Sequence, residues 1–155
     1  MSKQHDKEEI MSVLENVDVG AVATLDGNSP RIRMMHYAVD KNFDTYLTTM
    51  KGLPKTDQIT NSPAIALLIY QSVADINESR EVEITGKAFF VIDQEQRKQA
   101  LELVAQKSPA VKQLTETGNS GILDCIKVVP DMIKFRIFEE LAQGISPTVI
   151  EFPQN

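Results

Sequence analysis

Cysteine, histidine, tryptophan and long apolar runs are scarce or absent in this sequence. Cys125 is the only cysteine in 155 residues, so no internal disulfide can form and no thiol cluster can bind zinc. The N-terminal segment lacks the apolar core of a signal peptide, and no apolar run approaches the length of a membrane span. A net charge of −6 argues against nucleic acid or an anionic membrane as a partner, because both need a surplus of Lys and Arg. We expect one cytoplasmic domain over residues 1–155.

Positive charge and hydroxyl groups concentrate in one segment of this acidic chain. Between Gly27 and Thr56 there are two acidic residues and five basic ones, which are Arg31, Arg33, Lys41, Lys51 and Lys55. Thr48 and Thr49 belong to the same segment. Clustered cations and hydroxyls suit a small anion such as phosphate, so we expect an anion site here. A chance cluster on a solvated face is the alternative.

Hydrophobic periodicity predicts a mainly β chain with a few helices. The expected strands are 20–25, 31–39, 45–50, 63–70 and 80–92, followed by two strands around a turn at Pro130-Asp131 within 122–138. The expected helices are 6–17, 54–61, 94–107 behind the cap Asp93, and a shorter one after Pro109. Residues 71–79 are predicted to form a polar, mobile loop and residues 145–155 an extended tail.

Two glycines have a predicted role in the sheet. Asp26-Gly27-Asn28 is typical of a hairpin turn, and Gly86 in mid-strand indicates a bulge or a close approach by another segment.

Adjacent strands joined by short turns form antiparallel sheet, and six of them commonly close into a small barrel. The predicted fold is therefore α+β, mainly β: six or seven antiparallel strands in a barrel with two or three peripheral helices.

The strand 31–39 has two largely apolar sides. Period-two geometry places Arg31, Arg33, Met35, Tyr37 and Val39 on one side, and Ile32, Met34, His36 and Ala38 on the other. A barrel strand needs one apolar side for its own core. The other side should be covered by a partner subunit, a ligand or both, and a helix of the same chain is the alternative. The side of His36 is expected to face the core.

Four stretches follow one another in a defined order: VGAVATLDGNSPRIR, a strand ending in TT, KGLPKTDQITNSPAIALLI, and VEITGKAFFV. In this order, from about Val17 to Ile92, they resemble the pyridoxamine-phosphate-oxidase-like family of FMN-binding split barrels. The resemblance implies a split β-barrel and a homodimer that holds flavin mononucleotide (FMN) in a groove between its two subunits. Tyr37 and Tyr70 would then line the dimer interface or border the flavin, and interface packing is the preferred interpretation.

The resemblance also implies roles for individual residues. Arg33 and Lys55 would hold the FMN phosphate, assisted by Arg31 and Lys51; Thr48 and Thr49 would bond to phosphate and ribityl; and the backbone of Met34 and Met35 would run beside the isoalloxazine ring. The physical chemistry agrees, because arginine can bind a phosphate dianion through two parallel hydrogen bonds while lysine acts as a point charge. Lys55 would also lie in the first turn of the helix 54–61, where free backbone N–H groups favour an anion.

The sequence departs from that family in two places that bear on function. Leu53-Pro54 stand where pyridoxamine phosphate oxidases carry Ser-Arg, and Arg136 is the only arginine after residue 97, so the arginine-rich end that holds their substrate is missing. We therefore expect an FMN-dependent oxidoreductase that moves electrons between NAD(P)H or another donor and a small acceptor, and not vitamin B6 oxidation. One alternative is a non-catalytic stress or sensing module that binds flavin, haem or a deazaflavin. The other is a structural dimer with an empty groove.

Four further side chains are expected to have a structural role and no direct part in function. Cys125 is expected to be a small buried hydrophobe among apolar neighbours. Glu81 and Glu83 are expected to mark a solvated strand face. His36 is expected to be a core or groove-edge histidine, and a proton donor near the flavin is its alternative role.

Overall fold

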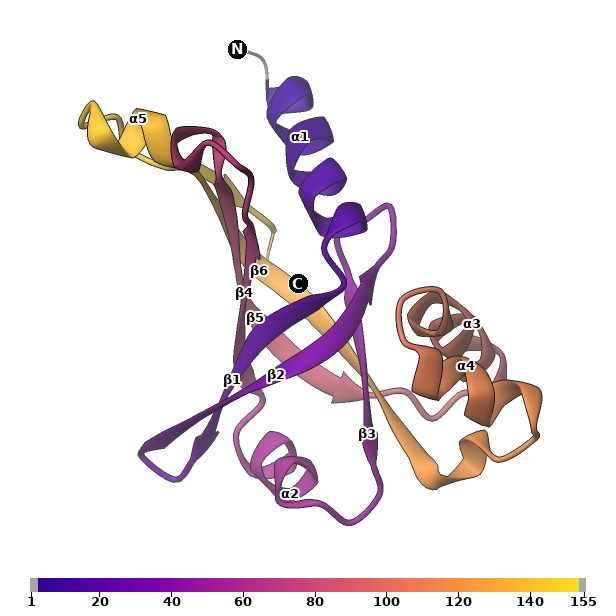
Figure 1. The fold of residues 1–155 in the computed structure, drawn as a ribbon. Helices are drawn as coiled ribbons and strands as arrows, with labels where there is room; N and C mark the ends of the chain where they lie inside the picture. Colours follow the sequence, from indigo (N-terminus) through magenta and orange to yellow (C-terminus); the bar gives the residue numbers. More distant parts are fainter. Residues whose placement is uncertain (1–2, 154–155) are drawn as a thin grey trace.

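The computed structural model describes residues 3–153, without the side chains of Lys3 and His5. Its seven strands form one antiparallel sheet in the order β3-β2-β1-β4-β5-β6-β7, and β3 also pairs with β6. This additional pairing closes β1 to β6 into a six-stranded barrel, and β7 is added beside β6 (Figure 1). The predicted mainly β, antiparallel barrel fold is confirmed.

The strands agree with the predicted positions except near the C-terminus. They are β1 (Val19–Asp26), β2 (Ser29–Val39), β3 (Thr45–Met50), β4 (Ala64–Gln71), β5 (Arg80–Phe90), β6 (Leu123–Ile137) and β7 (Thr148–Glu151). The helices are α1 (Lys3–Asn16), α2 (Pro54–Asn61), α3 (Gln94–Ala105), α4 (Pro109–Glu116) and α5 (Phe138–Ala142). Short 3₁₀ turns span Ile76–Glu78 in the predicted polar loop and Ser120–Ile122 before β6. The described chain thus has five α-helices: α1 to α4 lie at the four predicted positions, and α5 was not predicted.

Local sequence signals explain several of these boundaries. Gly27 takes a φ of 60° in the β1–β2 hairpin, a conformation that glycine adopts without strain. The carboxylate of Asp93 accepts a hydrogen bond from the Gln96 N–H at 3.0 Å and caps α3, as predicted. Ser108 caps α4 in the same way through the Val111 N–H.

The predicted turn at Pro130-Asp131 is wrong. Leu123–Ile137 is one continuous strand, and the register with β5 shifts between Thr85 and Gly86, so that Gly86 pairs with Pro130 and Thr85 with Met132. Asp131 is the extra residue of a β-bulge, a position where proline is tolerated in a sheet. A Cβ on Gly86 would lie 2.1 Å from the Val129 carbonyl oxygen. The prediction that Gly86 marks a bulge and a close approach is confirmed.

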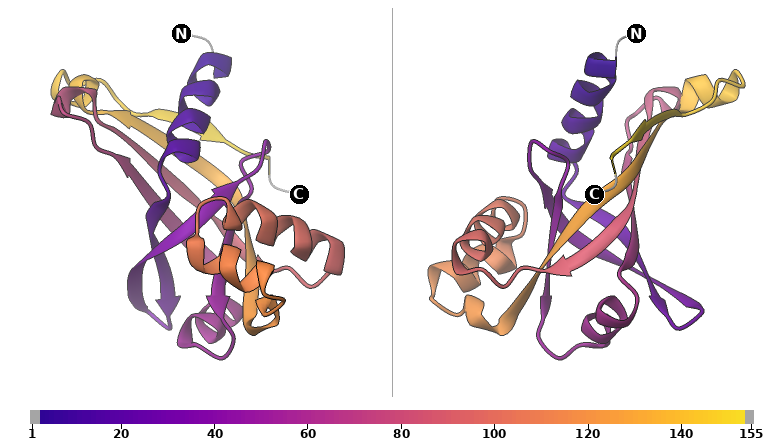
Figure 2. Two further views of the ribbon diagram at one scale, coloured as in Figure 1. Left: turned by 45° about the vertical axis from the view of Figure 1, so that its right-hand side comes forward. Right: turned by 180° about the vertical axis from the view of Figure 1, so that it is seen from behind.

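Two hydrophobic clusters place the helices around the barrel. In the barrel core, α1 contributes Ile10, Val13 and Leu14, which are 0–2% exposed. Outside the barrel, α3 and α4 cover Ala38, Leu123 and the buried Cys125. The views in Figures 1 and 2 place α1 at one end of the barrel and α2 at the other. The prediction for Cys125 is confirmed, since the residue is 2% exposed.

The two sides of β2 differ from the expectation. Tyr37 is fully buried in the barrel core, and Met35 and Val39 pack against the same cluster. The opposite side carries Ile32 and Met34, which are 73% and 64% exposed. His36 shares the side of Met34, so its expected place in the core is wrong, and so is the interface role of Tyr37. Because both sides of this strand are apolar, periodicity could not decide which of them faces inward.

Candidate functional site

The barrel is split between the first half of β2 and the second half of β3. These strands pair only at three positions, from Tyr37 with Leu47 to Val39 with Thr45. Residues 29–36 of β2 therefore have no strand partner on this side, while Thr48–Met50 pair with β6 alone. The α2 helix lies at this end of the barrel, below the split (Figure 1). The open strand edge leaves backbone donors and acceptors free for a ligand.

Arg33 lies at this split, and neutral groups hold its guanidinium. Nη1 donates to the Thr24 hydroxyl at 2.7 Å and to the Val22 carbonyl at 3.3 Å, and Nη2 donates to Gln58 Oε1 at 3.2 Å. The Thr24 hydroxyl itself donates to Gln58 Oε1 at 2.7 Å. Arg33 is thereby fixed between β1 and α2 without neutralisation of its charge.

Lys55 is a second cation beside Arg33. Burial, and then the positive charge of Arg33, lower the pKa of Lys55 below its ordinary value, and burial lowers the pKa of Arg33. Within residues 3–153, neither cation forms an ion pair with a carboxylate. Two partly buried cations that repel each other favour a bound anion, because an anion would offset both desolvation and repulsion.

Two threonine hydroxyls between β3 and α2 lack hydrogen-bond partners in the described part of the chain. Thr49, at the end of β3, is 5% exposed, and its buried Oγ1 has no partner in the described chain; the buried Oγ1 of Thr56 in α2 has none either. Such unsatisfied groups are uncommon in folded proteins, and no other group of the described chain satisfies these two. Thr48, by contrast, points to the other side of β3, so the two neighbouring hydroxyls do not converge.

The start of α2 has no side-chain cap, although Pro54 has no N–H group and the Thr56 N–H already donates to the Leu53 carbonyl at 3.0 Å. Leu53 occupies the N-cap position and has no side-chain group that can cap the helix, and Pro54 follows it in the first turn. The first N–H groups of an uncapped helix attract anions. Lys55 lies in this turn, as the sequence predicted.

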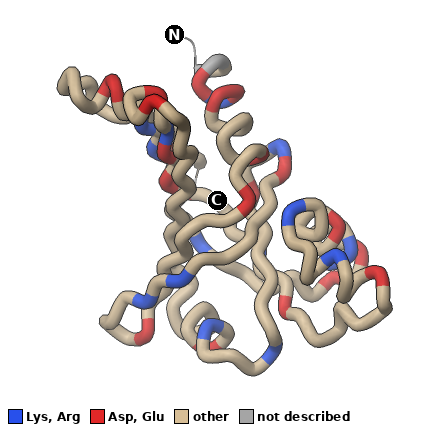
Figure 3. The backbone as a smooth tube through the Cα atoms, viewed as in Figure 1, with Lys and Arg blue, Asp and Glu red and all other residues tan. Residues whose placement is uncertain are grey.

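The remaining predicted site residues are not brought into this cluster. Arg31 lies 3.6 Å from the Asp26 carboxylate in an exposed ion pair. Lys51 is exposed, and Lys41 lines a hollow beside α1 with Lys7 and Glu8, so the basic segment is not compact. Figure 3 shows the basic residues near α2 separated from those beside α1. On β2, the Met34 side chain is exposed outside the barrel, and Met35 lies inside it.

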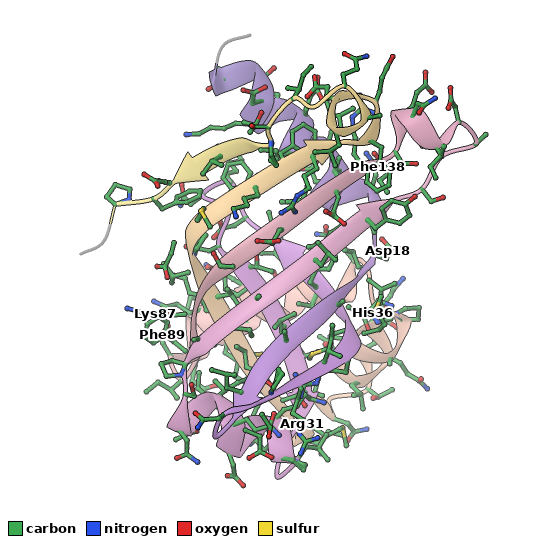
Figure 4. The ribbon with its side chains drawn as sticks, turned by 90° about the vertical axis from the view of Figure 1, so that its left-hand side faces the viewer. Asp18, Arg31, His36, Lys87, Phe89 and Phe138 are labelled. Atoms are coloured by element: carbon green, nitrogen blue, oxygen red, sulfur yellow. The ribbon has the colours of Figure 1, made fainter. Side chains whose placement is uncertain are left out.

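Among the described residues, no helix covers the outer face of β1, β4 and β5, or that of β2 before Ala38, which packs against α3 and α4. Figure 4 shows this face toward the viewer, with Arg31 and His36 along its β2 edge and Lys87 and Phe89 on the opposite side. One row across it pairs Met34, Ala21 and Leu68 in register, and a groove of about 360 Å³ follows the small residues Ala23, Ala66 and Thr85. Such an apolar sheet face is unusual on a monomer and suits a protein partner.

Glu81 and Glu83, on β5 at one end of the same face, are paired with a basic residue. Arg136 donates to Glu81 at 3.0 Å and to Glu83 at 3.3 Å. Tyr70 is 42% exposed, and its ring lies 5.5 Å from the ring of Phe138. Glu81 and Glu83 thus form a paired network and are not simply a solvated face.

Sequence reasoning missed Thr24, Gln58 and Thr56. None of them belongs to a recognisable motif, and their role depends on which residues α2 brings against β1 and β2. One weak signal existed: Thr56 and Gln58 follow Lys55 in the same predicted helix.

Neither a metal-binding cluster of side chains nor a membrane-spanning helix occurs among the described residues. No group of three or more His, Cys, Asp or Glu side chains between residues 3 and 153 could hold a metal ion. None of the helices in that range is long and apolar enough to cross a membrane.

Several known proteins are similar to this chain in sequence or in fold. General stress protein 26 of Bacillus subtilis is 30% identical over 88 residues, which cover 57% of this chain and 61% of that protein, less than two thirds of its length. A Listeria innocua protein provisionally described as a pyridoxamine 5'-phosphate oxidase is 26% identical, with a TM-score of 0.67 over 86% of this chain and 98% of its own. A haem-binding protein from Mycobacterium smegmatis shares the fold at a TM-score of 0.75 and 14% identity, over 94% of this chain and 57% of its own. The profile of the pyridoxamine 5'-phosphate oxidase family matches residues 6–126, so the chain belongs to that family.

Proposed function

We propose that this protein binds FMN at the split of the barrel and acts as a flavin-dependent oxidoreductase. One observation carries the proposal: Arg33 and Lys55 are neighbouring, partly buried cations without a carboxylate partner in the described chain. The FMN phosphate is a dianion, and its charge would compensate both of them.

The residues present fit the phosphate end of this cofactor. Arg33 would bind phosphate oxygens through the N–H groups that Thr24 and Gln58 leave free, and Lys55 would contribute a point charge. The unpartnered hydroxyl of Thr49 would donate to phosphate or ribityl oxygen. The open edge of β2 at Met34 and Met35 would face the ring system. Thr48, Lys51 and Arg31 would contribute less, because they point elsewhere or are exposed.

When bound, FMN would supply the transfer of a hydride or of two electrons between NAD(P)H or another donor and a small acceptor. The protein would bind and orient the cofactor and limit the access of water to it. This division of labour requires no acid–base constellation of side chains.

The proposed working form is a homodimer. The uncovered outer face presents Ile32, Met34, Leu68 and Val19 to solvent, and a second copy of the chain would bury them. Because Met34 also lies on the open edge of β2, the same association would enclose the flavin ring.

One spectrum of the purified protein tests the proposal. We expect flavin absorption bands, release of FMN identified by mass spectrometry, and turnover of NAD(P)H with a dye or free flavin as acceptor. A colourless protein whose thermal stability does not respond to added FMN would contradict the proposal and leave a structural dimer.

The fold shared with a haem-binding protein supports a second candidate function. A non-catalytic module could hold flavin, haem or a deazaflavin in the same groove. His36 is the one histidine whose side chain the structure describes, and it is half-buried on the outer side of β2. A Soret band with bound haem would favour this module, whereas tight FMN binding without turnover would favour a flavin sensor.

A further inference from the structure

The Thr24 hydroxyl connects Arg33 on β2 to Gln58 on α2. It accepts a hydrogen bond from Arg33 Nη1 at 2.7 Å and donates one to Gln58 Oε1, also at 2.7 Å. Gln58 Oε1 accepts a further bond from Arg33 Nη2 at 3.2 Å, so the three side chains form a closed cycle. Thr24 is buried, and its hydroxyl is already used both as donor and as acceptor. Any effect of Thr24 on a ligand must therefore act through Arg33.

The cycle decides which edge of the Arg33 guanidinium stays free. The group has five N–H donors in one plane: two on Nη1, two on Nη2, and one on Nε, which lies beside Nη2. Thr24 Oγ1 and Gln58 Oε1 are bonded to each other and accept from different nitrogens, so they cover the edge between Nη1 and Nη2. The Val22 carbonyl accepts from Nη1 at 3.3 Å. Within residues 3–153, the Nε–H and the second Nη2–H have no acceptor.

Two adjacent N–H groups on one edge of a guanidinium form a fork that can donate to two oxygens of a phosphate at once. We propose that Thr24 and Gln58 are positioning residues, which hold Arg33 so that its Nε–Nη2 edge binds two oxygens of the cofactor phosphate. The inference rests on the proposed function and adds the means by which the site orients its cation. Unlike Thr24, Arg33 is only half-buried.

Fixing a long side chain before the ligand arrives raises affinity. A mobile arginine loses rotamer freedom when it binds an anion, and this loss opposes binding. The cycle orders Arg33 during folding instead, and its neutral acceptors leave the positive charge uncancelled. Breaking the cycle should therefore weaken FMN binding by about 3- to 10-fold, the order of the cost of immobilising one long side chain.

The experiment titrates FMN and riboflavin by flavin fluorescence and takes the ratio of the two affinities as the phosphate preference. Thr24→Val removes the hydroxyl and keeps the shape of the side chain, and Gln58→Met does the same for the amide at a half-buried position of α2. Each variant should lower the phosphate preference by about 3- to 10-fold and leave riboflavin affinity unchanged. Thr24→Ser should restore the preference. Thr45→Val is the matched control, because Thr45 is a buried strand threonine whose hydroxyl donates to the Phe43 carbonyl.

A double variant shows whether Thr24 acts through Arg33. Lys55 remains in Arg33→Met, so this variant should keep a reduced phosphate preference that can be measured. Adding Thr24→Val to it should change nothing further, because the group that Thr24 positions is already gone.

The outcomes separate this inference from the proposed function. If the wild type prefers FMN, and Thr24→Val and Gln58→Met keep the full preference, the inference fails and the proposed function stands. If Thr24→Val weakens FMN and riboflavin alike, or lowers the preference of Arg33→Met further, Thr24 is not a positioning residue for Arg33. If the wild type binds FMN no more tightly than riboflavin, the proposed phosphate site fails and this inference fails with it.

Discussion

The guanidinium of Arg33 donates a 2.7 Å hydrogen bond to the Thr24 hydroxyl on the neighbouring strand. Thr24 is 3% exposed, so the acceptor end of this partly buried bond is shielded from water. Arginines in buried positions are usually matched by a carboxylate, yet the partners here are neutral oxygens. The fold thereby holds a positive charge in a fixed place and leaves it uncompensated.

Replacing Arg33 should abolish most of the affinity for FMN. Arg33→Met removes the charge and the paired N–H donors, and we expect binding to weaken by about 10- to 100-fold, since hydrogen bonds to charged groups contribute about 1.5–3 kcal/mol. Arg31→Met is the control, because Arg31 is exposed and paired with Asp26. Equal losses in the two variants, measured by fluorescence titration, would show that general positive charge and not this site attracts FMN.

Gln58→Glu should weaken FMN binding without lowering the stability of the FMN-free protein. A carboxylate at this position would accept from Arg33 at the place where Gln58 Oε1 now does, at 3.2 Å, and neutralise its charge. We expect the FMN-free variant to keep or gain thermal stability, and its FMN affinity to fall about tenfold through competition for the guanidinium.

The control for this change is Gln113→Glu, an exposed position on α4 with the same change in net charge. It should alter neither property. Undiminished FMN binding by Gln58→Glu would mean that the free charge of Arg33 has no part in binding.

The uncovered sheet face should control the oligomeric state. Leu68 lies at the centre of the face, in register with Ala21 and Glu83. Leu68→Asp places a charge in the proposed interface, where desolvation would oppose association. Sedimentation velocity should show a dimer for the wild type and a monomer for this variant. Ile92→Asp, at a position 86% exposed beyond the end of β5, should remain a dimer. A monomeric wild type would contradict the proposed assembly.

Lys107 should make the free energy of unfolding depend on pH between about 8 and 10.5. Its ammonium donates to the carbonyls of Leu14 and Val17 and lies 3.9 Å from the centroid of the Tyr37 ring. Burial lowers its pKa to about 8, although the nearby charges of Asp18 and Glu15 act in the opposite direction. The unfolded chain keeps this proton up to the ordinary pKa of 10.5, so between about pH 8 and 10.5 the unfolded state binds more protons. This residue's contribution to the free energy of unfolding therefore increases with pH in that window.

The measurement is a series of denaturant titrations from pH 7 to 10 on wild type and Lys107→Met. As the pH rises through this range, the unfolding free energy of the wild type should increase relative to that of Lys107→Met. Lys112→Met, at an exposed position on α4, should follow the wild-type profile. Parallel profiles for wild type and Lys107→Met would show that the amine titrates at its ordinary pKa.

The sequence predicted local elements well because their signals are local. Gly27 formed the expected hairpin, Asp93 capped α3, and Gly86 lies where another backbone approaches. Pro130 misled the prediction for the same reason. Proline and aspartate together indicate a turn, and only the pairing of β6 with β5 shows that the extra residue is a bulge.

The candidate site was predictable only where the family motif named its residues. Arg33, Lys55 and Thr49 come from the motif, and the structure places them at the split end of the barrel. Thr24 and Gln58 are separated from Arg33 by 9 and 25 residues, and no sequence pattern connects them. Their contribution depends on the packing of α2, which is a tertiary property.

The most direct test of the account compares FMN with riboflavin on ligand-free protein, because the two differ only in the phosphate. Fluorescence titrations of wild type and the double variant Arg33→Met/Lys55→Met give four dissociation constants. If Arg33 and Lys55 bind the phosphate, the wild type should bind FMN at least about tenfold more tightly than riboflavin, and the double variant should bind both equally weakly. A wild type without preference for FMN, or a double variant that keeps this preference, would contradict it.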